Sequence, residues 1–173
     1  MSKNNGKPAA TPHAIYPGSF DPPTSGHLDV IHRAAAIFPH VTVAVVVNPT
    51  KREPMFTVEE RKGMIRDCVR GLGHVDVADF RGLLADFVKE IDADVIIKGL
   101  RVVSDFENEM STALMNRSLS DVDTMFLMSD PHFSFVSSSL VKEVFLLGGD
   151  VSAYVPDIVL GFMQEKRAGL RSK

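Results

Sequence analysis

Short runs of β-branched and other apolar residues alternate along this chain with longer segments whose apolar positions recur every three or four residues. Runs of the first kind are typical of strands buried on both faces, and segments of the second kind are typical of helices with one apolar side. Their alternation predicts an α/β fold in which crossover helices connect the strands of a parallel sheet. The expected strands are His13–Tyr16, Val41–Val47, Val75–Phe80, Asp94–Lys98 and Asp123–Met128.

Helices are expected at His27–Phe38, from Thr57 to about Gly71, at Leu83–Ile91, from Ser104 to about Leu119, at Ser137–Leu147, and after Pro156. Two of them begin with the pattern of a capping box, Thr57 with Glu60 and Ser104 with Glu107. In such a box a hydroxyl and a carboxylate three residues later satisfy free amide groups of the first turn. A stripe at helical spacing is predicted to face the core, namely Met110, Leu114, Met115 and Leu119.

Right-handed crossovers must reverse direction once if helices are to cover both faces of such a sheet. We therefore predict a doubly wound, five-stranded, Rossmann-like parallel sheet of strand order 3-2-1-4-5, with the reversal between strands one and four. Ligands of open α/β sheets bind beyond the carboxyl ends of the strands at this reversal. The loops that reach this position are 17–26, 48–56, 99–103 and 129–139.

The length of 173 residues predicts one domain, which we place at 13–164 between a loose polar tail at 1–12 and a basic tail at 165–173. A hydrophobic content of 45% is that of an ordinary globular protein, and no apolar run is long enough to cross a membrane. The formal net charge of −3 argues against a general nucleic-acid binder. The single cysteine, Cys68, cannot form an internal disulfide, which favours the cytosol.

The loop after the first strand ends in the first turn of an expected helix, where His27 lies. The glycines and prolines of this loop fix a turn whose amide groups can face an anion, and the N-terminus of the helix favours phosphate. His27 would add a side-chain donor there. The alternative is an ordinary strand-to-helix turn in which Thr24 or Ser25 is only an N-cap and His27 is solvated.

Two further loops carry cations. Lys51 and Arg52 follow the second strand, where they are either surface residues or ligands of an anion. Lys98 ends an otherwise apolar strand, and a lysine in that position needs a negative partner because burying an isolated ammonium group is costly. That partner is either a bound phosphate or the carboxylate of Asp105 or Glu107.

Hydroxyl groups dominate the last loop, in which Ser137–Ser139 open a helix. Three hydroxyls beside free amide groups suit a phosphate, although a single serine would be enough as a cap. The chain offers no defensible Ser-His-Asp order, catalytic cysteine or phosphate-binding P-loop. A donor set of His27, Lys51, Lys98 and Arg101 instead favours phosphoryl or nucleotidyl transfer, in which positioning and charge stabilisation supply most of the catalysis.

Two short motifs carry a resemblance to a known superfamily. Thr24-Ser25-Gly26-His27 resembles the (His/Thr)-x-Gly-His signature of the nucleotidylyltransferases, and Val136-Ser137-Ser138-Ser139 resembles their Ile-Ser-Ser-Thr/Ser signature. Within that superfamily, the segments 16–27, 98–116 and 137–144 are similar to those of the bacterial phosphopantetheine adenylyltransferase family. The similarity extends from about Ala14 to Phe162.

This resemblance implies transfer of the adenylyl group of ATP to 4'-phosphopantetheine, which gives dephospho-coenzyme A and pyrophosphate in the penultimate step of coenzyme A synthesis. It also implies Mg²⁺ held mainly by the phosphates of ATP, feedback inhibition by coenzyme A, and a homohexameric assembly. The protein itself is expected to offer few metal ligands, because Mg²⁺ bound to substrate phosphates needs few.

The motif match also assigns residues to roles. His27 would stabilise the transition state, with Lys51 and Arg101 as further catalytic cations. ATP would be bound by Ser19, Phe20, His27, Gly99, Leu100, Arg101, Glu109, Phe133, Ser134, Phe135, Val136, Ser137, Ser138 and Ser139. Phosphopantetheine would be bound by Ser19, Lys51, Leu84, Lys98 and Asn116.

The chain departs from the commonest family pattern at three positions. Lys98 stands where many members have arginine, Ser19 where threonine is frequent, and Asn108 where tyrosine is frequent. The first change keeps the charge without bidentate geometry, and the last removes an aromatic ring. Two alternatives stay open: a nucleotidylyltransferase that makes NAD or a CDP-alcohol, and a binding module that keeps the fold without the reaction.

Overall fold

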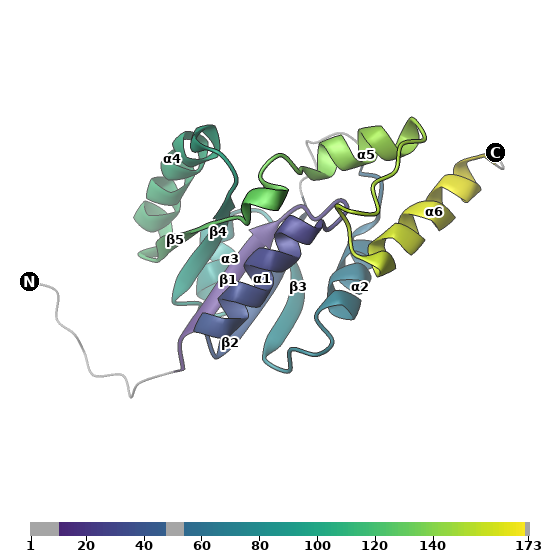
Figure 1. Ribbon diagram of the computed structural model, residues 1–173. Coiled ribbons are helices and arrows are strands. Elements are labelled where there is room, and N and C mark those ends of the chain that lie inside the picture. Colours follow the sequence, from purple (N-terminus) through teal and green to yellow (C-terminus); the bar gives the residue numbers. More distant parts are fainter. Residues whose placement is uncertain (1–10, 48–53, 172–173) are drawn as a thin grey trace, which may run out of the picture.

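A five-stranded parallel sheet forms the centre of the described structure (Figure 1). The computed structural model describes residues 11–47 and 54–171. All strands are parallel and lie in the order β3-β2-β1-β4-β5, which confirms the doubly wound topology predicted from the sequence. Their bounds are β1 His13–Gly18, β2 His40–Val47, β3 Val75–Arg81, β4 Val95–Leu100 and β5 Asp123–Met128.

Helices cover both faces of this sheet, and β1 shows how one strand serves both. Ala14 and Tyr16 pack in a buried cluster with α1, whereas Ile15 packs in a different cluster with Phe87 and Val88 of α3. Because successive side chains of a strand point to opposite faces, α1 lies in front of the sheet and α3 behind it (Figure 1). The helices are α1 Ser25–Ile37, α2 Val58–Cys68, α3 Leu84–Glu90, α4 Val103–Ser120, the 3₁₀ helix η1 Pro131–Phe133, α5 Ser138–Leu146 and α6 Asp157–Arg171.

The C-terminal helices form a third buried cluster with the start of α2. Phe145 of α5 and Met163 of α6 pack in this cluster with Met64 of α2. Val136 is buried in the same cluster, and Phe133 packs against it. This packing fixes the chain between β5 and α5, so that the serine-rich start of α5 lies beside the carboxyl ends of the strands.

Several helix ends differ from those expected. The capping box at Thr57 and Glu60 is confirmed, but α2 ends at Cys68 instead of about Gly71. The second box was wrong: α4 is capped by Val102, which has no side chain able to cap, and Ser104 already lies inside the helix.

The expected end of the domain, residue 164, lies inside a helix. Helix α6 continues through residue 164 to Arg171, so the segment placed in a basic tail is helical over most of its length. Of the N-terminal segment expected to be a loose tail, residues 1–10 lie outside the described part of the chain.

The apolar stripe of α4 does not face the core of this chain. Of the described residues of that helix, Asn116 is the one that is buried. The exposed fractions of the stripe are 42% for Met110, 62% for Leu114, 61% for Met115 and 44% for Leu119. The predicted helical period is therefore confirmed and the predicted burial was wrong. Helix α4 lies at one end of the sheet (Figure 1), and the four side chains of the stripe are exposed. No helix within residues 11–47 and 54–171 is long and apolar enough to cross a membrane.

Candidate active site

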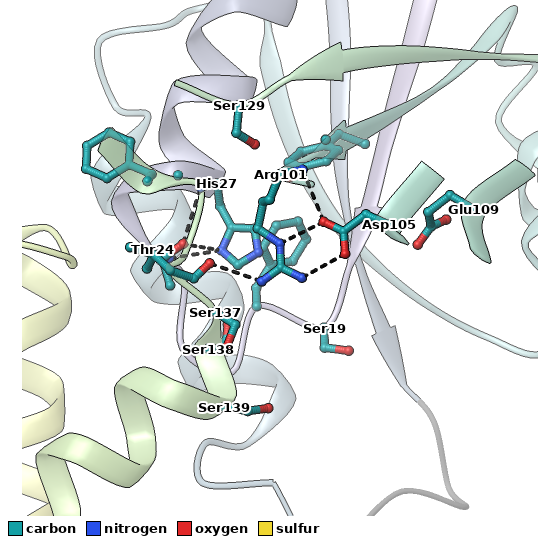
Figure 2. A pocket seen from close by; sticks show the side chains of 16 residues that line it. Ser19, Thr24, His27, Arg101, Asp105, Glu109, Ser129, Ser137, Ser138 and Ser139 are labelled. Atoms are coloured by element: carbon teal, nitrogen blue, oxygen red, sulfur yellow. Dashed lines mark hydrogen bonds and ion pairs between the residues drawn. The ribbon is translucent and has the colours of Figure 1, made fainter. Parts of the chain in front are cut away.

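A cavity of about 370 Å³ opens at the carboxyl ends of β1, β4 and β5 (Figure 2). This is the point where the winding of the sheet reverses, as predicted for a ligand site. The described residues that line it are Tyr16, Ser19, Phe20, Thr24, Gly26, His27, Gly99, Arg101, Asp105, Glu109, Ser129, Phe133, Val136, Ser137, Ser138 and Ser139.

Helix α1 begins with a reciprocal pair of hydrogen bonds between Thr24 and His27. The His27 amide N–H donates to Thr24 Oγ1 at 3.3 Å, and the Thr24 amide N–H donates to His27 Nδ1 at 3.0 Å. A backbone amide can only donate, so Nδ1 must carry a lone pair and the proton of the neutral ring lies on Nε2. The start of the helix therefore both positions the ring and selects its tautomer.

The protonation state of His27 follows from its surroundings. Burial of the ring is the larger cause and the positive charge of Arg101 the smaller one, and together they lower the pKa of His27 from 6.5 to about 4. At neutral pH the side chain is thus an uncharged donor through Nε2–H. It can offer a hydrogen bond to an anion, and it is too weak a base to remove a proton efficiently.

The ring of Phe20 packs against the ring of His27. Phe20 is 1% exposed and meets the His27 ring edge-on, with 5.1 Å between the ring centroids. The backbone of Phe20 adopts a φ of 48°, a left-handed conformation that is unusual for a residue with a side chain and is held here by the burial of the ring. The phenyl group is consequently part of the packing, and Phe20 is among the residues that line the cavity.

Arg101 follows β4 and joins three segments around the cavity. Its Nε and Nη2 donate to the two carboxylate oxygens of Asp105 at 3.0 and 3.1 Å, and its Nη1 donates to the Val136 carbonyl at 3.2 Å (Figure 2). The side chain is 37% exposed. The cation is therefore fixed in direction and still accessible from the cavity.

Lys98 finds a partner that the sequence analysis did not name. Its Nζ lies 3.2 Å from Glu109 Oε2, so neither Asp105 nor Glu107 pairs with it. Asp105 and Glu109 are four residues apart on α4 and hold Arg101 and Lys98 respectively. Two parallel ion pairs thus connect the end of β4 to α4.

The three serines at the start of α5 have different roles. Ser137 is the N-cap, and its Oγ accepts the Leu140 amide N–H at 3.2 Å. Ser138 donates its hydroxyl to the Pro22 carbonyl at 2.8 Å, which ties α5 to the loop after β1. Ser139 lies exposed at the rim of the cavity. A single serine would cap the helix, so the other two add a tether between loops and a hydroxyl at the rim.

The loop after β1 is pinned by buried charges. The Asp21 carboxylate accepts the Phe56 amide N–H at 2.9 Å and pairs with Lys142 of α5. Arg61 of α2 is 5% exposed and donates from Nη1 to the Ser19 carbonyl at 2.7 Å. These contacts hold the backbone around Ser19 against α2 and α5.

Gly99 is required by close packing between the sheet and α1. A Cβ atom at this position would lie 3.0 Å from Val30 Cγ2 and 3.4 Å from the Tyr16 hydroxyl oxygen. A side chain there would crowd Val30 of α1 and Tyr16 of β1, and these neighbours would have to shift slightly to make room for it.

Some residues assigned by motif lie away from the cavity lining. Leu100 is buried in the sheet, Leu84 packs behind the sheet at the start of α3, and Asn116 is buried on α4. Ser134 and Phe135 belong to the chain between η1 and α5, and Phe135 is mostly exposed. Lys51 and Arg52 lie outside the described residues.

Conversely, the cavity is lined by residues that sequence reasoning did not assign to it: Tyr16, Thr24, Gly26, Asp105 and Ser129. Thr24 and Gly26 stand inside the first motif, so the motif itself was the available signal. Asp105 pairs with Arg101 across the start of α4, because Arg101 precedes the helix and Asp105 lies in its first turn, and no sequence motif marks that contact.

The arrangement is one of donors around an anion-sized space. A neutral imidazole, a guanidinium group, serine hydroxyls and the free amide groups at the starts of α1 and α5 surround the cavity. Such a site can bind phosphate groups and stabilise negative charge that develops on them.

The low pKa of His27 can be measured directly. We expect its ring to titrate near pH 4 in nuclear magnetic resonance spectra that follow the Cε1 proton. An unfolded histidine titrates at about 6.5. Protonation therefore favours the unfolded chain, and stability from this group is lost as pH falls from about 6.5 towards 4. A midpoint above 6 would contradict both the burial and the bond from Thr24.

Comparison with known proteins agrees with this geometry. Residues 15–144 match the cytidylyltransferase-like family. The chain is 51% identical over 158 residues to a phosphopantetheine adenylyltransferase of Natranaerobius thermophilus, an alignment that covers 91% of this chain and 97% of the relative. It is 53% identical over 154 residues to the enzyme of that name from Heliobacterium modesticaldum, with 88% and 91% covered.

A solved structure from Vibrio parahaemolyticus, described as a nicotinate-nucleotide adenylyltransferase, has the same fold. The TM-score is 0.67 at 17% identity, and the alignment covers 90% of this chain and 99% of the other. A likeness at this level of identity concerns the fold alone. The two sequence relatives, together with the donor-lined cavity at the reversal of the sheet, lead to one conclusion: the chain belongs to the phosphopantetheine adenylyltransferase family.

Proposed function

We propose that this protein transfers the adenylyl group of ATP to 4'-phosphopantetheine, giving dephospho-coenzyme A and pyrophosphate. The observation that carries the proposal is the neutral His27, held by Thr24 with its free N–H on Nε2, beside Arg101 in the cavity. An enzyme that hydrolysed its substrate through a base would need a stronger base than this ring. A neutral ring that is fixed with its N–H towards the cavity can still donate a hydrogen bond that stabilises phosphate charge.

The chemistry requires little from a base. The second pKa of a phosphate monoester is about 6, so the phosphate of the acceptor is already largely ionised at neutral pH. One of its oxygens attacks the α-phosphorus of ATP in line, a new phosphorus–oxygen bond forms, and the bond to the β-phosphate oxygen breaks as pyrophosphate leaves. His27 stabilises the charge on the oxygens of the α-phosphorus in the transition state, and Arg101 and Lys51 neutralise neighbouring phosphates.

The remaining roles follow the motif match. In this proposal Ser19, Phe20 and Gly99, which line the cavity, bind ATP, and Ser137–Ser139 with the preceding turn hold its phosphates. Phosphopantetheine is bound by Ser19, Lys51, Leu84, Lys98 and Asn116 in this proposal. For Lys98 this means that the acceptor phosphate shares or displaces Glu109, its present partner.

Magnesium fits this site as a companion of ATP. The cavity carboxylates, Asp105 and Glu109, are each held by a cation. No group of three or more His, Cys, Asp or Glu side chains in the described part of the chain could hold a metal ion. In this proposal the metal would be held mainly by the triphosphate, where it would neutralise the charge of the leaving pyrophosphate.

Assembly and regulation complete the proposal. A homohexamer is the state we propose in solution, and the uncovered apolar side of α4 is the surface that supports it. Coenzyme A, a downstream product that shares the pantetheine arm, acts as feedback inhibitor in the same cavity. The reaction takes place in the cytosol, where a single unpaired cysteine is ordinary.

The reaction is tested by pyrophosphate release. We expect release from ATP when 4'-phosphopantetheine is added, and none with nicotinamide mononucleotide or glycerol 3-phosphate, or with CTP in place of ATP. Release with another acceptor would keep the fold and overturn the acceptor assigned here. A complete lack of release would support a binding module without catalysis.

Replacement of His27 by alanine tests its role. Loss of one transition-state donor lowers kcat by roughly 10² or more, and the KM for ATP changes little because the ground state uses the donor less. His132→Ala, on the exposed 3₁₀ helix η1, serves as the control and should behave as the parent chain. An unchanged kcat with a raised KM for ATP would refute the role of His27.

The assembly is tested by charging the apolar side of α4. We expect the unmodified chain to show six times the mass of 19.0 kDa by light scattering, and Leu114→Glu to give a smaller species. Ile37→Glu is the matched control, because Ile37 is an equally exposed apolar residue on α1. A substitution at Leu114 that leaves the mass unchanged would exclude this surface.

A further inference from the structure

Asp105 lines the cavity, yet the proposed reaction leaves it without a role. It is the third residue of α4, and its carboxylate makes three contacts with Arg101 (Figure 2). The Arg101 amide N–H donates to Asp105 Oδ2 at 3.1 Å, and the Nε and Nη2 groups donate to its two oxygens at 3.0 and 3.1 Å. Burial works against ionisation, but the bonds from Arg101 outweigh it and lower the pKa of Asp105, so the group is a carboxylate at neutral pH.

Counting donors shows what this contact achieves. A guanidinium group has five N–H donors in one plane. Among the described residues, Asp105 takes one from Nε and one from Nη2, and the Val136 carbonyl takes one from Nη1. One N–H remains on each terminal nitrogen. Because the plane is fixed on two sides, the direction of these two donors is fixed as well, and they are the pair that can grip phosphate oxygens.

The contact exceeds what the start of a helix needs. The Arg101 amide N–H lies just before the N-cap of α4, and its bond to Asp105 Oδ2 already gives this backbone group an acceptor. The two side-chain bonds contribute nothing to that purpose. Their geometry, with two parallel N–H···O bonds, is the one that orients a planar cation most strictly.

Electrostatics gives this arrangement a definite cost. The negative charge of the Asp105 carboxylate reduces the attraction that Arg101 alone would exert on a triphosphate. Asp105 therefore weakens the attraction of the site for anions, and at the same time it fixes the orientation of the Arg101 guanidinium group. Such an exchange favours the transition state over the ground state, because orientation matters most where the geometry is most demanding.

We propose that Asp105 is a positioning residue for adenylyl transfer, which holds the Arg101 guanidinium so that its two free N–H donors face the phosphates of the bound nucleotide. The inference rests on the proposed function. It predicts that loss of the carboxylate affects kcat far more than nucleotide affinity, because the positive charge stays near the site while its direction is lost.

Asp105→Asn is the principal test, since it keeps the size of the side chain and removes the bidentate acceptor. We expect kcat to fall roughly ten- to hundredfold while the Kd of ATP, measured by calorimetry without acceptor, stays within about threefold. Glu107→Gln removes the same charge from an exposed position on the same helix and should leave both values unchanged. If the Asn variant does not fold, Asp105→Ser repeats the comparison, because serine also offers an acceptor at the helix start.

A double-mutant cycle separates action through Arg101 from direct action on the substrate. Lysine at position 101 keeps the charge and cannot present a planar fork, so Asp105→Asn should cost little further kcat in the Arg101→Lys background. The same loss of kcat in both backgrounds would overturn the proposal, because Asp105 would then act on the substrate itself.

The titration of His27 provides a test that needs no substrate. Simple removal of a negative charge would lower the pKa of His27, whereas displacement of Arg101 would raise it, since Arg101 is one of its depressing causes. We expect the midpoint to rise in Asp105→Asn, with the resonance assigned by its loss in His27→Gln. A midpoint that is unchanged or lower would show that Arg101 has not moved and would overturn the proposal.

If the parent chain released no pyrophosphate with any acceptor, the proposed function would fail, and this titration and the binding of ATP would still decide the role of Asp105.

Discussion

The change of winding direction between β1 and β4 is the constraint on which the other features of this structure depend. It leaves the carboxyl ends of these two strands without a helix laid directly across them, so their loops and the chain after β5 meet around a cavity. Those loops hold one another through backbone carbonyls. The Ser19 carbonyl accepts a hydrogen bond from Arg61, and the Pro22 carbonyl accepts one from Ser138. The Val136 carbonyl accepts one from Arg101. The cavity therefore lies between loops, and the hydrogen bonds that connect these loops determine its shape.

The charge around this cavity is balanced rather than strongly positive. Arg101 of the cavity lining pairs with Asp105, and Lys98 of β4, which is not among the lining residues, pairs with Glu109 of the lining. His27, which also lines the cavity, is held in its neutral form. On the function proposed above, such a site would recognise an anion by the direction of its donors more than by the strength of its field. The formal net charge of −3 for the whole chain is consistent with such local recognition.

The sheet, its strand order and the position of the site could be predicted because they follow from the period of apolar residues and from the handedness of crossovers. What failed depends on contacts that periodicity does not encode. The stripe through Leu114 has the period of a helix, but a period cannot say whether the covering surface belongs to the same chain. The pairing of Lys98 with Glu109 and the start of α4 at Val103 depend on how β4 meets that helix in space. Motif comparison located His27 and the serines, yet it passed over Asp105, which acts on a neighbouring side chain instead of lying in a signature.

The reciprocal cap between Thr24 and His27 has a consequence beyond the geometry of the first turn. With its ring uncharged down to about pH 4, the histidine contributes no titration step between mild acid and neutrality. The phosphate of the acceptor does change charge in that interval, because its second ionisation lies at about 6. Within the reacting groups, a response to mild acidification is therefore expected from the small molecule and not from His27, whose ring stays neutral while the substrate phosphate gains or loses the ability to attack.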